Sequence, residues 1–209
     1  MLAAPDPGAT LRVGTAGIAA RPPEGQPHRH SMAASYEAVL ETAKPEHALL
    51  LGHLIELYLH DLSDIFPIDV GPNGRFGYDR LPLYFEEPER HLPFVIRANG
   101  HPAGFALVTR GSPVTQDPAD LDIAEFFVAR RYRRSSVGRT AAFQLWDRMP
   151  GRWIVRVSEG NRRGLPFWRK IISEYTNGVF SVDTLPGTPH PWCVLTFRSP
   201  QGEFTTRPS

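Results

Sequence analysis

Residues 123–145 read IAEFFVARRYRRSSVGRTAAFQL. In this segment an apolar, strand-like run leads into an arginine-rich turn, a loop of small residues and an apolar stretch with helical spacing. The first N–H groups of a helix have no partner within it and lie at the positive end of its dipole, so this order favours an anion site. Guanidinium groups also suit phosphate oxygens. The segment predicts a phosphate or diphosphate site, although a solvated turn before a surface helix also explains the loop taken alone.

The spacing within the loop narrows the choice of ligand. It has neither the Gly-Lys-Ser/Thr ending of a P-loop nor the three spaced glycines of a dinucleotide site. It resembles the acyl-CoA-binding segment of the GNAT superfamily of N-acyltransferases, Gln/Arg-x-x-Gly-x-Gly/Ala after a strand, with Arg133, Ser136 and Gly138 in the named places. Ser136 departs from the pattern, which has glycine at this place. A serine has a Cβ, which restricts how closely a diphosphate can approach. The resemblance implies a cofactor loop made of Arg133, Arg134, Ser135, Ser136, Val137, Gly138 and Arg139.

A second segment, EGNRRGLPFWRKII at residues 159–172, supports the resemblance. It is similar to the family's Asn, small residue three positions later and hydrophobic–aromatic pair entering a helix, with Asn161, Gly164, Phe167 and Trp168 in those places. The resemblance implies that Asn161, Phe167 and Trp168 lie beside the pantetheine arm and the thioester of the acyl donor. Two matches in this order, one strand–helix unit apart, argue against coincidence.

The composition is that of one ordinary globular domain. The chain has 209 residues, of which 41% are hydrophobic, and a formal net charge of +1, which gives no general attraction to nucleic acid or membrane. The single cysteine, Cys193, excludes a disulfide framework and a cysteine-cluster metal site. No apolar run is long enough for a membrane span or a signal peptide, so we expect a cytoplasmic protein. We predict a disordered extension at 1–31, an acyltransferase domain at 32–200 and a tail at 201–209.

The periodicity and turn signals predict the secondary structure. Asn99-Gly100 between two apolar runs is a hairpin signal. We expect helices at 45–62, 83–87, 136–148 and 165–175, and strands at 36–41, 91–98, 103–109, 122–129, 152–157, 179–183 and 192–198. This order also matches the GNAT family. It predicts an α/β (α+β) fold: a mixed central sheet of about seven strands with helices on both faces and one parallel strand pair. The resemblance to the GNAT family implies that this parallel pair is splayed at the cofactor site.

The resemblance also implies how the acyl donor binds. Acetyl-CoA inserts between the splayed strands, the backbone of Phe126, Phe127 and Val128 pairs with its pantetheine amides, and an N–H there polarises the thioester carbonyl. The position that often carries a tyrosine acid in the family holds Trp168, whose indole cannot serve. A thiol of pKa ~8.5 leaves tolerably as thiolate without an acid. Tyr175 is a remote substitute, better explained as a packing residue.

Glu125 is the candidate catalytic base. It stands in an apolar strand, and burial raises a carboxyl pKa toward the range useful for taking a proton from an amine. Period-two alternation puts it on one face with Ile123 and Phe127. The alternative is that it lies on the other face and pairs with an arginine, and Asp122 is a weaker candidate base.

We expect the acceptor site at the end of the first long helix and in the loop after it. Acidic and aromatic side chains gather there, and both suit a cationic amine. The predicted substrate-binding residues are Tyr58, Asp61, Tyr78 and Tyr84, with His60, Asp64 and Asp69 nearby.

Three functions fit the sequence. The first is an acetyl-CoA-dependent N-acetyltransferase that acts, without a metal, on a small-molecule or protein amine, as monomer or homodimer. The second is a non-catalytic acyl-CoA-binding or sensing module, which is supported by Ser136 in place of the loop glycine and Trp168 in place of the tyrosine acid. The third, nucleic-acid binding through the arginine run, conflicts with the near-zero charge and the poor interleaving of aromatic residues, so we expect no nucleic-acid partner.

Overall fold

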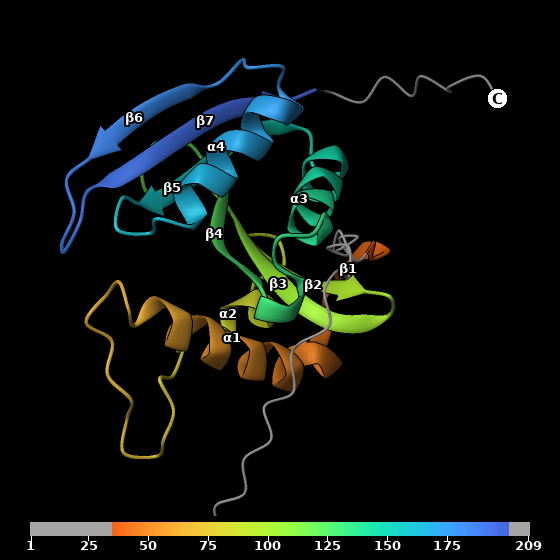
Figure 1. Ribbon diagram of the computed structural model, residues 1–209, viewed down its shortest axis with the longest axis vertical. Coiled ribbons are helices and arrows are strands. Elements are labelled where there is room, and N and C mark those ends of the chain that lie inside the picture. Colours follow the sequence, from red (N-terminus) through yellow and green to blue (C-terminus); the bar gives the residue numbers. More distant parts are fainter. Residues whose placement is uncertain (1–34, 201–209) are drawn as a thin grey trace, which may run out of the picture. The chain divides into compact units, whose positions relative to one another are not determined.

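The computed structural model describes residues 35–200, and the predicted extension at 1–31 and tail at 201–209 lie outside this range. The elements within it follow the predicted order (Figure 1). They are β1 (Ala38–Thr42), the short 3-10 helix η1 (Pro45–His47), α1 (Ala48–Leu62), α2 (Leu83–Glu86), β2 (His91–Ala98), β3 (His101–Arg110), β4 (Leu121–Val128), the 3-10 helix η2 (Arg130–Tyr132), α3 (Val137–Arg148), β5 (Gly151–Ser158), α4 (Gly164–Tyr175), β6 (Ser181–Leu185) and β7 (Trp192–Ser199).

The strands of the described residues form one seven-stranded sheet in the order β1-β2-β3-β4-β5-β7-β6. Every neighbouring pair is antiparallel except β4 and β5. These two are parallel because α3 carries the chain from the end of β4 back to the start of β5. The mixed sheet with one parallel pair confirms the predicted fold class.

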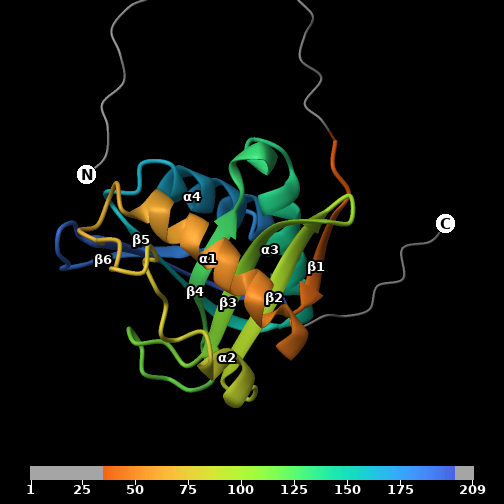
Figure 2. The same ribbon diagram turned by 90° about the horizontal axis from the view of Figure 1, so that it is seen from below.

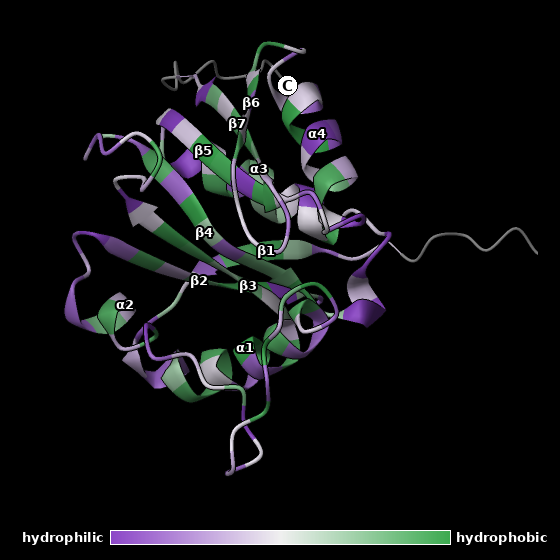
Figure 3. Ribbon diagram, turned by 90° about the vertical axis from the view of Figure 1, so that its left-hand side faces the viewer, coloured by the Kyte–Doolittle hydropathy of each residue, from purple (hydrophilic) through white to green (hydrophobic). Residues whose placement is uncertain are grey.

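Helices cover both faces of the sheet, and each face has its own apolar core. α3 and α4 lie on one side of β4, and α1 and α2 lie on the other (Figures 1 and 2). The fully buried Trp146 and Trp153 belong to the core under α3 and α4, and Leu51, Ile55 and Phe105 belong to the core under α1. Figure 3 shows the largely apolar strands between these helices. The sheet therefore holds the two helix layers apart, and β4 contributes side chains to both.

Local backbone chemistry explains the element boundaries. Asn99 (φ 49°) and Gly100 (φ 78°) form the predicted tight turn between β2 and β3. The strand predicted at 179–183 begins at Ser181 instead, because Asn177 (φ 52°) and Gly178 (φ 84°) prolong the turn after α4. The helix predicted from Ser136 begins one residue later, since Ser136 is its N-cap.

A β-bulge at Ala124 decides which way the side chains of β4 point. Leu107 pairs with Glu125 while the next residue of β3, Val108, pairs with Ile123, so Ala124 is an extra residue on β4. As a result Ile123 packs in the core under α3 and α4, whereas Phe127 packs in the core under α1. The simple alternation that put Ile123 and Phe127 on one face is therefore wrong.

Candidate active site

The pairing of β4 with β5 ends partway along the two strands. They pair only through Leu121, Asp122 and Ile123, which face Trp153, Ile154 and Val155. From Ala124 to Val128, β4 has β3 on one side and no strand partner on the β5 side. Half of the main-chain N–H and C=O groups of this stretch therefore have no strand partner. The Val128 carbonyl accepts from Arg133, and the others stay available to a ligand that extends like a strand.

The start of α3 follows this free edge. Its first intrahelical bond runs from Thr140 N–H to the Ser136 carbonyl, and Val137 N–H donates to Ser135 Oγ at 3.3 Å. Within residues 35–200 the N–H groups of Gly138 and Arg139 have no partner. Unpartnered N–H groups at a helix N-terminus attract anions. The expected anion loop is thus open at its main chain.

Gly138 lies where α3, α4 and β4 meet. A Cβ at this position would sit 3.3 Å from the Phe167 ring and 3.4 Å from the Val128 side chain. Phe167 in turn stacks on Phe126, with ring centroids 6.2 Å apart. The structure therefore brings together the predicted residues of the loop, the free edge and the helix α4.

Two arginines of the loop, Arg133 and Arg139, bind carboxylates, whereas Arg134 is exposed and has no such partner among residues 35–200. Arg133 donates to the Val128 carbonyl at 2.6 Å and forms an ion pair with Asp61, which also binds Arg130 at 2.7 Å. Arg139 pairs with Glu174 at 2.7 Å. The expectation was that these guanidinium groups face the diphosphate. In the structure those of Arg133 and Arg139 are instead bound to acidic side chains of α1 and α4.

The same ion pairs change the expected place of Asp61. Burial is the largest single influence on the pKa of Asp61 and raises it. The ion pairs with Arg130 and Arg133 together outweigh burial, so the pKa is lowered overall. Asp61 is therefore directed to the arginine turn and away from the cluster of tyrosines on the same side of the sheet.

Trp168 and Asn161 serve the framework of α4. Trp168 is 8% exposed and packs edge-on against Phe126, with ring centroids 5.0 Å apart, and near Trp146. Asn161 Oδ1 accepts the Gly164 N–H at 2.7 Å, which satisfies one of the free donors at the start of α4. Tyr175, the remote substitute acid, donates to Asp147 at 2.8 Å and packs on Phe143.

Replacing Asn161 by Ala removes this cap, and we expect the free energy of unfolding to fall by about 1 kcal/mol. Urea denaturation monitored by circular dichroism measures the change. Asn161→Asp, which keeps the acceptor oxygen, should stay within a few tenths of a kcal/mol of the unsubstituted protein. Equal losses in both variants would show that the hydrogen bond to Gly164 does not stabilise α4.

Glu125 lies under α1, in a cluster of tyrosines. Tyr58 of α1 donates to its Oε2 at 2.5 Å, and Tyr78 from the loop before α2 donates to its Oε1 at 3.2 Å. The Ala124 bulge is what turns Glu125 to this face. Burial raises the pKa of the Glu125 carboxyl, against the two hydrogen bonds and the nearby arginines, which lower it. The alternative in which Glu125 pairs with an arginine is not realised.

Within this cluster Tyr84 is buried, and Tyr58 and Tyr78 are half-buried. Burial and the adjacent Glu125 raise the pKa of Tyr58, Tyr78 and Tyr84 above the usual range for a phenol. Each therefore keeps its proton at physiological pH and can act as a hydrogen-bond donor. Tyr84 also packs edge-on against His91, with ring centroids 5.0 Å apart.

Asp122 shares the face of Glu125 but is fully engaged. Arg156 of β5 binds both of its oxygens, at 2.9 and 3.1 Å, and Ser112 donates to it at 2.6 Å. Asp122 is completely buried. These contacts leave it poorly placed to take a proton, so the geometry favours Glu125 over Asp122 as a base.

Sequence reasoning missed the partners of this network. Arg156 and Ser112 were not among the predicted site residues, and an arginine inside the apolar run Arg152–Val157 was the one available signal. The stacking of Phe66 on Trp192, at 5.7 Å between centroids, was also missed. It joins the loop after α1 to the start of β7.

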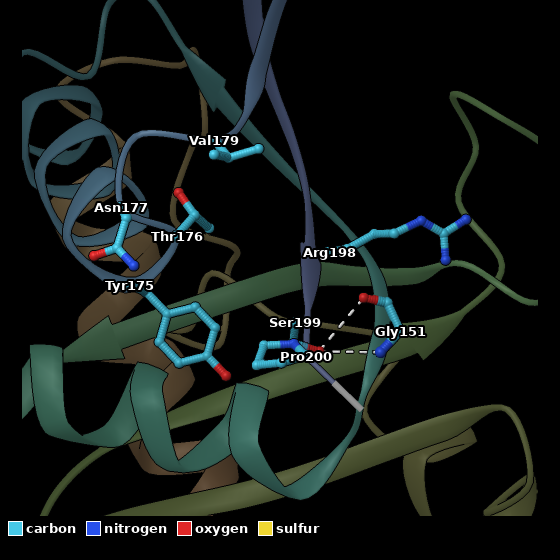
Figure 4. A pocket seen from close by; sticks show the side chains of 8 residues that line it. All are labelled: Gly151, Tyr175, Thr176, Asn177, Val179, Arg198, Ser199 and Pro200. Carbon is cyan, nitrogen blue, oxygen red and sulfur yellow. Dashed lines mark hydrogen bonds between the residues drawn. The ribbon is translucent and has the colours of Figure 1, made fainter. Parts of the chain in front are cut away.

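A separate hollow of about 500 Å³ lies at the other end of β5 (Figure 4). It is lined by the end of α4 and by Gly151, Arg198 and Ser199, with Ser199 Oγ hydrogen-bonded to Gly151. Neither Glu125 nor the loop at 133–139 borders it. The hollow therefore lies apart from the candidate site.

Two kinds of feature are absent among residues 35–200. No helix there is both long and apolar enough to cross a lipid bilayer. No group of three or more His, Cys, Asp or Glu side chains in this part of the chain is arranged to hold a metal ion.

Known proteins provide the comparison for this geometry. The sequence profile of the Acetyltransferase (GNAT) family matches residues 55–172, more than half of the chain. No curated protein matches the sequence. Solved structures that resemble the fold include paia N-acetyltransferase from Thermoplasma acidophilum in complex with coenzyme A, at 12% identity, 78% coverage of this chain, 99% coverage of that one and a TM-score of 0.55.

Two more structures have similar values. yncA from Salmonella typhimurium, solved with acetyl-CoA, shares 11% identity over 79% of this chain and 96% of its own, with a TM-score of 0.56. The ribosomal-protein-S18-alanine N-acetyltransferase from Escherichia coli shares 13% identity over 82% and 99%, with a TM-score of 0.53. At such identities the likeness shows a common fold.

Proposed function

Because the chain belongs to the GNAT family of acetyltransferases, we propose that it transfers an acetyl group from acetyl-CoA to a primary amine of a small molecule or an exposed protein amine. The amine attacks directly, within a ternary complex. The observation that supports this most is the half-buried Glu125 on β4, which separates from β5 after Ile123. Glu125 lies three residues before Val128, the last residue of β4, whose side chain is next to Gly138 at the start of α3. A base and an anion site then border one free main-chain edge.

The chain's main-chain groups are suited to hold the donor. The edge of β4 at Phe126, Phe127 and Val128 matches the amides of a pantetheine arm, except at the Val128 carbonyl, which Arg133 binds. The N–H groups of Gly138 and Arg139 match a diphosphate. Phe167, next to Gly138, borders the same region. Acetyl-CoA supplies an acyl group activated as a thioester, and a main-chain N–H of β4 polarises its carbonyl.

Glu125 acts as the base in this proposal. An alkylamine has a pKa of ~10.4 and is protonated at neutral pH, so it must lose a proton before it attacks. Burial raises the pKa of Glu125, which brings its proton affinity closer to that of the amine. The amine approaches from the side of α1 and the following loop, where Tyr58, Tyr78 and Tyr84 gather around the carboxyl.

The leaving thiolate needs no dedicated acid. Trp168 packs in the core, and the hydroxyl of Tyr175 is bound to Asp147. A thiol with a pKa of ~8.5 is a tolerable leaving group in its ionised form. The amine nitrogen loses a second proton as the tetrahedral intermediate collapses, and this proton passes to the departing thiolate or to solvent. The proton taken up by Glu125 returns to solvent after the product leaves.

A non-catalytic acyl-CoA-binding module is the second candidate, favoured by Trp168 at the place of the acid. Calorimetric titration with acetyl-CoA, followed by a thiol-release assay over a panel of amines, separates the candidates. We expect binding at micromolar to sub-millimolar concentration and thiol release with at least one class of amine. Binding without turnover on the whole panel favours the second candidate, and the absence of binding by acetyl-CoA and CoA removes both.

A further inference from the structure

Two phenol hydroxyls hold the two oxygens of one carboxyl. Tyr58 binds Glu125 Oε2 at 2.5 Å and Tyr78 binds Oε1 at 3.2 Å, and the residues come from segments 67 and 47 positions away in the chain. A phenol has one O–H to donate. Both hydroxyls therefore spend their only proton on Glu125, so each can accept a further hydrogen bond but cannot donate a second one.

The ring of Tyr58 is fixed in this position by its packing. It lies edge-on to Phe105 and Phe127, with ring centroids 5.7 and 6.0 Å away, within the core under α1. Turning the hydroxyl toward a ligand would break these contacts and leave the half-buried Glu125 carboxyl without one of its donors, which is costly. The contact with Glu125 is thus built into the core.

We propose that Tyr58 and Tyr78 are positioning residues, which act on the reaction by holding the Glu125 carboxyl and not by binding the acceptor. This inference rests on the proposed function, in which Glu125 is the base. It reassigns two residues that sequence reasoning gave to the acceptor site. Tyr84 makes no hydrogen bond to Glu125 and is 3% exposed, within the core under α1.

The charges around Glu125 set the direction of the expected effect. The surrounding polar groups, element by element, are Tyr58 of α1, Tyr78 and Arg80 of the loop before α2, Tyr84 of α2, Asp122 of β4 and Arg156 of β5. Burial raises the pKa of Glu125, and the two hydroxyls together with Arg156 and Arg80 lower it. Two nitrogens of the Arg156 guanidinium donate to the two oxygens of Asp122. Arg156 therefore does not take the place of a lost tyrosine hydroxyl as a donor to Glu125.

Removing one hydroxyl should therefore raise the pKa of Glu125 further. A base works in its ionised form, so kcat/KM rises with pH through this pKa, and a higher pKa moves the acidic limb of the profile to higher pH. A hydrogen bond to a charged group corresponds to a shift of about one pH unit. We expect about that shift for Tyr58→Phe and a smaller one for Tyr78→Phe, whose hydrogen bond is longer.

The kinetic test compares the acetyl-CoA reaction of the full chain with that of the variants. For Tyr58→Phe we expect the acidic limb to move up by about one pH unit while the KM for the amine, measured above that limb, changes less than threefold. Tyr175→Phe is the matched control, because it also removes a hydroxyl that donates to a carboxylate, here Asp147, and should leave the limb in place. An unmoved limb with a tenfold higher KM would mean that Tyr58 binds the acceptor, and would overturn the proposal.

A second measurement does not depend on turnover. Carbon-13 NMR of protein labelled at the glutamate carboxyl carbons gives the Glu125 titration directly, and Glu125→Gln identifies its signal. A rise of about one pH unit in the Glu125 midpoint in Tyr58→Phe supports the proposal even if the amine is not yet known. An unchanged midpoint in both tyrosine variants overturns it, whereas a raised midpoint in an enzyme whose rate survives Glu125→Gln would refute the base role alone.

Discussion

Glu125→Gln lowers kcat by roughly 100- to 10,000-fold and leaves acetyl-CoA binding unchanged, which is the largest effect on the reaction that the structure predicts. A glutamine has the shape of glutamate but cannot take a proton from the amine. Its amide can still accept from one of the two tyrosines, so the core around Tyr58 is preserved. The side chain lies on the α1 face, while the proposed donor contacts of β4 are main-chain groups.

Steady-state thiol release across pH measures this effect, and calorimetry checks the binding of acetyl-CoA. Glu41→Gln is the control, because Glu41 lies on the edge strand β1 and pairs with Arg97 at 2.5 Å, away from the site. It should keep the full rate. A Glu125→Gln enzyme within about threefold of the unsubstituted rate at every pH would exclude Glu125 as the base.

Ser136→Asp is expected to weaken the binding of acetyl-CoA by roughly 100- to 1,000-fold. Ser136 is the N-cap of α3, directly before Val137 and Gly138. A carboxylate placed there repels a diphosphate at the same helix end, and two unit charges about 4 Å apart interact by about 4 kcal/mol near a protein surface. The helix itself should not suffer, because Asp is among the preferred N-cap residues and a negative charge suits the helix dipole.

Ser136→Asn is the matched control for this charge. Asparagine has nearly the same size as aspartate and caps a helix equally well, but it is neutral. The Ser136→Asn protein should therefore bind acetyl-CoA within about tenfold of the unsubstituted protein. Thermal unfolding checks that both variants stay folded. Equal affinities for Asp and Asn at position 136 would mean that the diphosphate lies elsewhere.

The sequence was sufficient to predict most elements because their signals are local. The alternating run at Arg152–Val157 and the Asn99-Gly100 turn depend on nearest neighbours, and both appear where expected. The parallel pairing of β4 with β5 followed from a strand–helix–strand order, which has one favoured handedness and one favoured return path. The splay of this pair was expected from the family resemblance.

The details of the site were less predictable because they depend on residues far apart in the chain. The bulge at Ala124 is a two-to-one register between β3 and β4, so no pattern within 121–128 alone reveals it. The ion pair of Arg133 with Asp61 joins positions 72 residues apart. Arg130 binds the other oxygen of the same carboxylate. Charge in a turn identifies an anion site only after such internal partners are known.

Hydrogen exchange with and without acetyl-CoA tests the central claim most directly, since it detects the main-chain groups proposed to hold the donor. The account predicts slower exchange in two segments, 124–128 at the free edge of β4 and 136–139 at the start of α3, when acetyl-CoA is bound. Protection confined to the hollow lined by Gly151 and Arg198, or no protection at all at saturating acetyl-CoA, would contradict it.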